Sequence, residues 1–149
     1  MPNTSSVPTV KNTLKTLLAA RVALSGVQLT WAYPGIDKIA RESLFFDRTE
    51  LSEVSGQLGN QRRHETYTQY MYVCVKKETN DVQVVEQRAW TLVGEIEQQL
   101  RTDASLALTP ANGVQSVVVQ FAGAESECYQ QDQGWSCEIR VALNVQARI

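Results

Sequence analysis

The sequence predicts an α+β fold, in which a single mixed or antiparallel β-sheet of about four to five strands packs against two main helices. Two segments, one near the start of the chain and one over residues 82–101, repeat apolar residues at helical spacing. Other segments alternate apolar and polar residues with a period of two, as strands with one buried face do. Because no linker or internal repeat separates these patterns, we expect both helices to cover one sheet.

Length and composition indicate one globular domain. A chain of 149 residues buries roughly 70% of its unfolded surface. Residues 1–9 are polar and carry two prolines, so we expect a flexible N-terminal arm followed by one domain over residues 10–149. The formal charge of −2 comes from interspersed acids and bases, which disfavours nucleic-acid binding through a basic face. Without a membrane-length apolar run or a signal peptide, we expect folding in the cytoplasm.

The first helix is expected over about residues 8–25. Pro8 suits its first turn, and Gly26 suits its end. Residues 27–33 then alternate at period two before Pro34-Gly35, which predicts a strand with one buried face.

The middle of the chain gives mixed signals. Over residues 34–65, two short runs look extended, whereas Gly56 and Gly59-Asn60 interrupt any longer element. We therefore expect a short strand or hairpin followed by a mobile loop. Residues 65–76 place aromatic and β-branched side chains on both faces, which predicts a strand covered on both sides.

The second helix, over residues 82–101, is the clearest element, because its apolar residues step by three and four. Two antiparallel strands are expected to finish the fold, over residues 114–121 and 137–149. The polar stretch 123–134 between them is expected to be a long hairpin loop.

The three cysteines are an odd number without CxxC spacing, which fits neither a disulfide scaffold nor a zinc site. We expect Cys74, Cys128 and Cys137 to be ordinary strand residues. Cys128 and Cys137 flank the expected hairpin loop, but a bridge requires Cα atoms roughly 4.4–6.8 Å apart, which sequence does not settle. A reducing cytoplasm argues against that bridge.

Catalytic motifs are absent from the sequence. The only histidine, His64, lacks the partners that a metal site or a general base needs. There is no GxSxG nucleophile elbow and no GxGxxG or GxxxxGK[ST] phosphate loop. We therefore expect a binding protein that has no catalytic residue, metal or cofactor.

Some side chains fit poorly as purely structural residues. Trp90 projects about 100° from the apolar stripe of the second helix, so it either packs under a loop or anchors a partner. Consecutive Phe45 and Phe46 point to opposite faces of a strand, and a thin sheet does not easily bury both, so we expect one to meet a partner. Arg21 lies within the first helix's stripe, where its head either reaches water or meets the helix C-terminus or an acidic partner.

Several short motifs occur in a definite order over roughly residues 10–149. They are Leu17-Leu18-Ala19-Ala20, an aromatic strand ending at Pro34, Leu58-Gly59, Arg62-Arg63-His64-Glu65-Thr66-Tyr67, Gln87-Arg88-Ala89-Trp90, Val93-Gly94-Glu95-Ile96-Glu97-Gln98-Gln99-Leu100, Arg101-Thr102-Asp103-Ala104-Ser105-Leu106 and Ala147-Arg148-Ile149. In this order they resemble the tail-terminator (tail-completion, minor tail protein U-like) family of long-tailed bacteriophages. The resemblance implies a small α+β subunit that is not an enzyme.

By that resemblance, six copies would form a ring on the head-proximal end of the tail tube in the virion, after assembly in the host cytoplasm. The ring would stop tube polymerisation and join the tail to the head connector. The implied partners are further copies of the chain, the tail-tube protein and the connector or stopper protein, with DNA only in passage through the lumen and no membrane. Arginines in the irregular segment would face a neighbour, the tube or the lumen. The expected interface residues are Phe45, Phe46, Arg48, Arg62, Arg63, His64 and Trp90.

Two alternatives stay open. Another tail or connector subunit, such as a tail-tube or head-closure protein, would have a related fold, but a tube subunit would form open polymers where a terminator closes a ring. A small ligand-binding or hydrolytic α+β domain would instead hold a pocket between sheet and helices. Its expected lining residues are Tyr67, Tyr70, Trp31 and Trp135.

Overall fold

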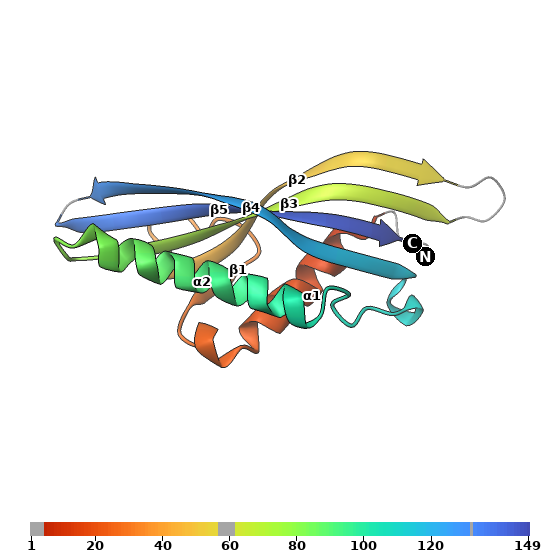
Figure 1. The fold of residues 1–149 in the computed structure, drawn as a ribbon, viewed down its shortest axis with the longest axis horizontal. Helices are drawn as coiled ribbons and strands as arrows, with labels where there is room; N and C mark the ends of the chain where they lie inside the picture. Colours follow the sequence, from red (N-terminus) through yellow and green to blue (C-terminus); the bar gives the residue numbers. More distant parts are fainter. Residues whose placement is uncertain (1–4, 57–61, 132) are drawn as a thin grey trace.

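The computed structural model describes residues 5–56, 62–131 and 133–149. In chain order the elements are α1 (Val7–Ala19), η1 (Val22–Leu24), β1 (Gln28–Thr30), β2 (Glu42–Gly56), β3 (Arg63–Lys77), α2 (Val82–Thr102), η2 (Pro110–Asn112), β4 (Ser116–Gln131) and β5 (Gly134–Arg148). Figure 1 shows a long twisted sheet with both α-helices on one side of it. The two helices and the five-stranded mixed sheet confirm the predicted α+β fold.

The strands lie in the order β1-β2-β3-β5-β4, so β3 and β5 form the centre of the sheet. The pairing of β1 with β2 is parallel, and every other neighbouring pair is antiparallel. The β3–β5 ladder runs without a register shift from His64 opposite Arg148 to Lys77 opposite Trp135. An unbroken ladder between the two most apolar strands gives the helices one continuous surface on which to pack.

The core fills the space between this central surface and the helices. From α1 it takes Val10, Leu14 and Leu18, which recur at intervals of four and so share one helical face. The contribution of α2 follows the predicted three-and-four stripe. The α2 residues buried there are Val85, Ala89, Leu92, Val93, Ile96, Gln99 and Leu100.

The first helix differs from its prediction at both ends. It stops at Ala19 instead of near residue 25, because Arg21 adopts an extended conformation that starts a separate 3₁₀ turn. It begins at Val7, so residues 7–9 of the expected arm are helical, and Ser6 is buried. Residues 1–4 of that arm lie outside the described residues.

The second strand is longer and the first is shorter than predicted. β2 runs for 15 residues to Gly56, where a short strand or hairpin followed by a mobile loop was expected. Register shifts between Phe46 and Thr49 and between Leu51 and Glu53 let it follow β3 to that point. Residues 57–61 of the expected loop lie outside the described part of the chain. β1 keeps only Gln28–Thr30 of the predicted strand.

Two further predictions were wrong. Residues 123–131 of the expected loop are not a loop, because β4 continues to Gln131, which pairs with Gly134 of β5. The β4–β5 pairing has a register shift between Phe121 and Gly123 and continues on both sides of it. Pairing with β5 therefore makes this segment a strand, although its local sequence is polar. β3 is not fully covered on both sides, since its helix-side residues are buried while Tyr70 and Tyr72 on the other face are only half-buried.

Candidate interaction surfaces

The face of the sheet opposite the helices carries a groove of about 540 Å³. The segment between β1 and β2 forms one side of it, and β4 forms the other. Its residues come from that segment and from the outer faces of the strands. They are Tyr33, Ile36, Ile39, Ala40, Arg41, Phe45, Asp47, Tyr72, Cys74, Lys76, Glu78, Tyr129, Gln131, Ser136 and Glu138.

Aromatic rings form the floor of the groove, and their packing bears on the prediction that Phe45 or Phe46 meets a partner. The ring of Phe45 lies 5.4 Å from that of Tyr33 and 5.6 Å from that of Tyr72, centre to centre. On the helix side, Phe46 lies 6.1 Å from Trp31. Phe45 is therefore 6% and Phe46 2% exposed, so the expectation that the sheet leaves one of them uncovered is wrong. The segment after β1 covers both faces of β2, which the thin-sheet argument did not consider.

The polar groups of the groove hold no activated nucleophile among the described residues. Burial is the main cause that raises the pKa of the Cys74 thiol to about 12, so it stays protonated at neutral pH. Glu138 accepts a hydrogen bond from the Tyr129 hydroxyl at 2.8 Å, and Arg41 pairs with Glu78 at 3.4 Å. Among the described residues, no three His, Cys, Asp or Glu side chains are placed to hold a metal ion.

The groove is not the pocket that sequence reasoning placed between sheet and helices. It lies on the opposite face, and none of the four expected lining residues borders it. Tyr67 is fully buried in the core, where burial raises its pKa to about 12. Tyr70 lies on the outer face between two guanidinium groups, Arg140 at 4.0 Å and Arg48 at 4.9 Å from its ring centre.

Arg48 thus belongs to an exposed cluster near the middle of β2. Its guanidinium also pairs with Glu50 at 2.9 Å, and the same glutamate accepts a hydrogen bond from the Tyr70 hydroxyl at 3.3 Å. The cluster presents a cation over an aromatic ring to solvent, which is a geometry suited to a protein contact.

Arg62, Arg63 and His64 lie together where β3 begins, but they differ in accessibility. Arg62 and His64 are exposed, whereas Arg63 is half-buried and forms an ion pair with Glu65. Arg63 also exchanges two backbone hydrogen bonds of 2.9 Å with Ile149. Only Arg62 and His64 therefore combine the expected position with a free surface.

The carboxylate of Glu65 is buried and ties the start of α1 to β3. It accepts hydrogen bonds from the Ser6 N–H at 2.9 Å, the Ser6 hydroxyl at 2.7 Å and the Ser5 hydroxyl at 3.3 Å, in addition to its pair with Arg63. Burial raises the pKa of Glu65, but these hydrogen bonds outweigh it and leave the pKa below its usual value. Sequence reasoning missed this contact because its members are 59 residues apart.

Arg21 meets an acidic partner, one of the alternatives that the sequence left open. Its guanidinium donates to Glu95 at 2.9 and 2.7 Å and to Gln99 at 3.1 Å. Because both acceptors lie on α2, this contact fastens the end of the first helical segment to the second helix.

Trp90 is 40% exposed on the outward face of α2. It borders a shallow hollow with Gln83, Glu86, Gln87 and Thr91. Gly94 follows one turn later, and a methyl group added there would meet no atom within 4 Å. The open space at Gly94, beside the exposed Trp90, lets a partner's backbone approach this stretch of α2 closely.

The far end of the β2–β3 hairpin extends beyond both helices (Figure 1). Leu51 and Val54 lie there on the helix-side face, opposite the buried residues Tyr67 and Glu65. None of the described helices covers β2 itself at this point, so Leu51 is 50% and Val54 47% exposed. Among the described strands, β1 pairs only with Ser43–Phe45, which leaves the rest of β2 as a free edge. The sequence indicated an extended run here but did not reveal this surface, because exposure depends on which face of the strand the helices cover.

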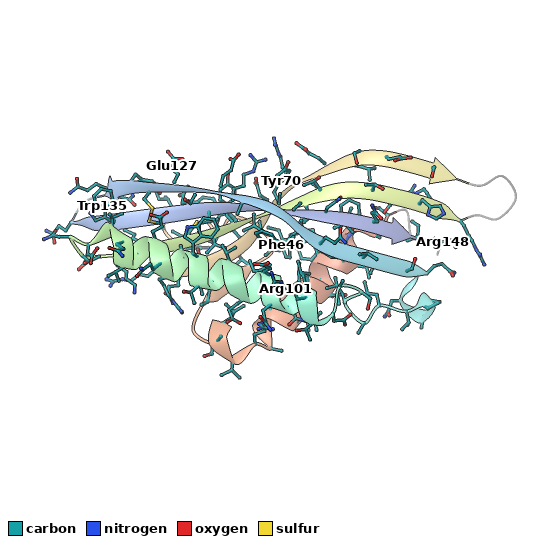
Figure 2. All side chains as sticks on the ribbon, viewed as in Figure 1. Phe46, Tyr70, Arg101, Glu127, Trp135 and Arg148 are labelled. Carbon is teal, nitrogen blue, oxygen red and sulfur yellow. A yellow bond between two sulfur atoms is a disulfide. The ribbon has the colours of Figure 1, made fainter. Side chains whose placement is uncertain are left out.

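Cys128 and Cys137 form a disulfide between β4 and β5, contrary to the expectation of ordinary strand residues. They are direct partners in the β4–β5 ladder, with Cα atoms 4.1 Å apart. Figure 2 shows the sulfur–sulfur bond near Trp135, at the end of the sheet opposite the projecting β2–β3 hairpin. The sequence did not settle the distance between the two cysteines, and the extended β4–β5 ladder brings them together.

Comparison with known proteins reveals a likeness of fold. No family model and no curated protein matches the sequence. A chain in the structure of the virion of a native gene transfer agent (GTA) particle matches with a TM-score of 0.70 over 99% of this chain and 100% of that one, at 11% sequence identity. The two chains share a fold. Within the described residues, no helix is both long and apolar enough to cross a membrane.

Proposed function

We propose that this chain is a structural subunit of a phage-like virion, and that it acts there as a tail terminator. The observation that carries the proposal is the likeness of fold to a GTA virion chain, because it covers 99% of this chain and 100% of that one. The ordered motifs described above support the finer assignment.

The proposed mechanism is cyclic assembly through two different surfaces. The free part of β2 with Leu51 and Val54 lies at one edge of the sheet, and β4 forms the other edge. Two unlike edges on one subunit favour head-to-tail contacts, which close into a ring when the rotation between copies permits. Such a ring, of six copies by the resemblance, would cap the head-proximal end of the tail tube and present its other side to the connector. DNA would pass only through its lumen.

Specific side chains are assigned to this assembly. Arg48, Arg62 and His64 would face a neighbouring copy, the tube or the lumen, with Arg63 holding the base of the projecting hairpin. Trp90 would anchor a contact on the outer face of α2. Phe45 and Phe46 would not touch a partner; they would stabilise β2 by packing against neighbouring aromatic rings of the same chain.

The test is imaging of assembled tail tubes after the purified chain is added, with light scattering of the chain alone. The proposal expects a ring in solution or a cap at one tube end. Open-ended filaments of the chain alone would favour a tube subunit instead. If the chain stayed a monomer that ignores tubes, the groove would make ligand binding the better account.

A variant with Arg62→Ala and Arg63→Ala tests the residue assignment separately. Weakened ring formation or tail joining would support it, with Arg101→Ala as a control, since Arg101 is an exposed arginine that pairs within α2. Unchanged assembly of the double variant would remove Arg62 from the interface and would show that assembly does not need Arg63 at the base of the hairpin.

A further inference from the structure

The far half of β4, over residues 124–131, is a strand that its own sequence does not favour. Its side chains are mostly polar and exposed, and as an edge strand it pairs only with β5 among the described strands. Glu127 lies directly opposite Glu138 in the ladder, and like charges in that position destabilise a strand pair. This end of the sheet therefore needs support from another source.

The disulfide supplies that support at the next ladder position. Cys128 follows Glu127 and bonds to Cys137, which precedes Glu138. The cysteines face the helices, whereas Glu127 lies on the opposite face (Figure 2). The hairpin end is also tightly seated, since a Cβ on Gly134 would collide with the Lys77 carbonyl. A covalent link here fixes the strand against both fraying and charge repulsion.

The two cysteines differ in accessibility in a way that suits reversible chemistry. Cys128 is half-buried on the edge strand, and Cys137 is fully buried. The third thiol, Cys74, points to the groove on the opposite face and is also buried. Its raised pKa keeps it protonated, so it does not compete in thiol exchange.

We propose that Cys128 and Cys137 form a redox staple that is open in the reducing cytosol and closes after the particle leaves the cell. This inference rests on the proposed virion role, because only that role moves the chain from a reducing to an oxidising environment. Closing the staple stabilises the far half of β4, and with it the wall of the groove that Tyr129 and Gln131 form.

The chemistry needs a small-molecule disulfide from the oxidising medium. The accessible Cys128 loses its proton and attacks one sulfur of that disulfide, releasing one thiol and leaving a mixed disulfide on Cys128. Cys137 then loses its proton and attacks the Cys128 sulfur, releasing the second thiol. The two protein thiols are oxidised by two electrons, the small disulfide is reduced by two, and both protons end on the released thiols.

The test counts thiols in the full-length chain by acid quenching, denaturing alkylation and mass measurement. The staple predicts three alkylated thiols in chain taken directly from a reducing bacterial cytosol and one, at Cys74, after incubation with oxidised glutathione. One alkylated thiol in the cytosolic sample would mean that the bond is permanent and would overturn the proposal. Three thiols after oxidation would overturn it as well.

Amide hydrogen exchange tests the structural effect on the same samples. Reduction should speed exchange in residues 124–131 by at least about tenfold and leave α2 unchanged. Cys128→Ser should behave like the reduced chain under both conditions, and Cys74→Ser should keep the full response. Equal exchange in the oxidised and reduced chains would contradict the staple.

Thiol counts and amide exchange are read on the isolated chain, so failure of ring formation would count against the proposed function and leave these results intact.

Discussion

The centre of the molecule and the two ends of its sheet are stabilised in different ways. At the centre, β3, β5 and α2 bury apolar side chains on one face, with Met71, Val141 and Leu92 fully enclosed. At the ends, the β2–β3 and β4–β5 hairpins continue as strands whose outer members, β2 and β4, carry mainly exposed side chains. Burial stabilises the centre, whereas ladder hydrogen bonds, one buried carboxylate and one disulfide hold the ends.

Because of this difference, we expect the centre of the molecule to determine its stability and the ends of the sheet to mediate its assembly. A region stabilised by burial has little exposed apolar surface with which to bind another chain, whereas the β2–β3 end leaves Leu51 and Val54 exposed. The ends are thus available for contacts with partners, and substitutions there should affect assembly more than folding.

A matched pair of leucine truncations tests the contrast directly. Leu92→Ala removes a fully buried side chain and should lower the free energy of unfolding by about 2–5 kcal/mol. Leu51→Ala removes the same atoms from a half-exposed side chain and should cost less than about 1 kcal/mol. Chemical denaturation measures both. Equal losses would mean that the projecting end belongs to the core after all.

Reduction of the disulfide tests how the β4–β5 end is held. The bond links residues nine apart in sequence, and opening it should lower the free energy of unfolding by about 2–3 kcal/mol. Denaturation with and without a reductant measures the change. Cys74→Ser is the control and should show the same difference. If wild-type stability did not respond to the reductant, the hairpin would not depend on its cross-link.

Glu65→Gln tests the buried carboxylate at the other end. Losing its charged hydrogen bonds should cost about 1.5–3 kcal/mol at neutral pH. Because the folded pKa of Glu65 lies below its unfolded value, its contribution is complete above the unfolded pKa of about 4.3 and is lost as pH falls through the folded pKa. The stability gap between wild type and variant should therefore narrow below about pH 4. A gap that stayed constant into acid would contradict the assigned ionisation.

Arg21→Met gives the smallest expected effect. Its pair with Glu95 is partly exposed, so its loss should cost at most about 1 kcal/mol and less in high salt. Arg101→Met removes a more exposed pair within α2 and should cost less still. Thermal unfolding at two salt concentrations compares them. A larger loss of stability for Arg101→Met than for Arg21→Met would mean that the Arg21–Glu95 contact between the two helical segments does not stabilise the fold.

Sequence reasoning succeeded where local pattern and tertiary environment agree. The apolar stripe of α2 and the alternation of β5 follow directly from burying one face, so both elements were predicted almost to their ends. The far half of β4 and the continuity of β2 as far as Gly56 were missed, because pairing with neighbouring strands and not the local sequence makes these segments strands.

The candidate surfaces also divide into those that the sequence predicted and those that depend on tertiary structure. The exposed Trp90 was found from its angle on a well-predicted helix. The exposure of Leu51 and the bond between Cys128 and Cys137 depend on strand length and register, which one sequence does not specify. Phe45 and Phe46 were misjudged because the segment that covers them follows a strand shorter than the one predicted.

Native mass spectrometry of the wild-type chain and of a Leu51→Asp, Val54→Asp variant tests whether the exposed end of β2 holds the ring together. We expect a closed ring for the wild type, and a monomer with an unchanged unfolding midpoint for the variant. A wild-type chain that remained monomeric both alone and in the presence of tail tubes would contradict this expectation, and so would a ring that survives both substitutions.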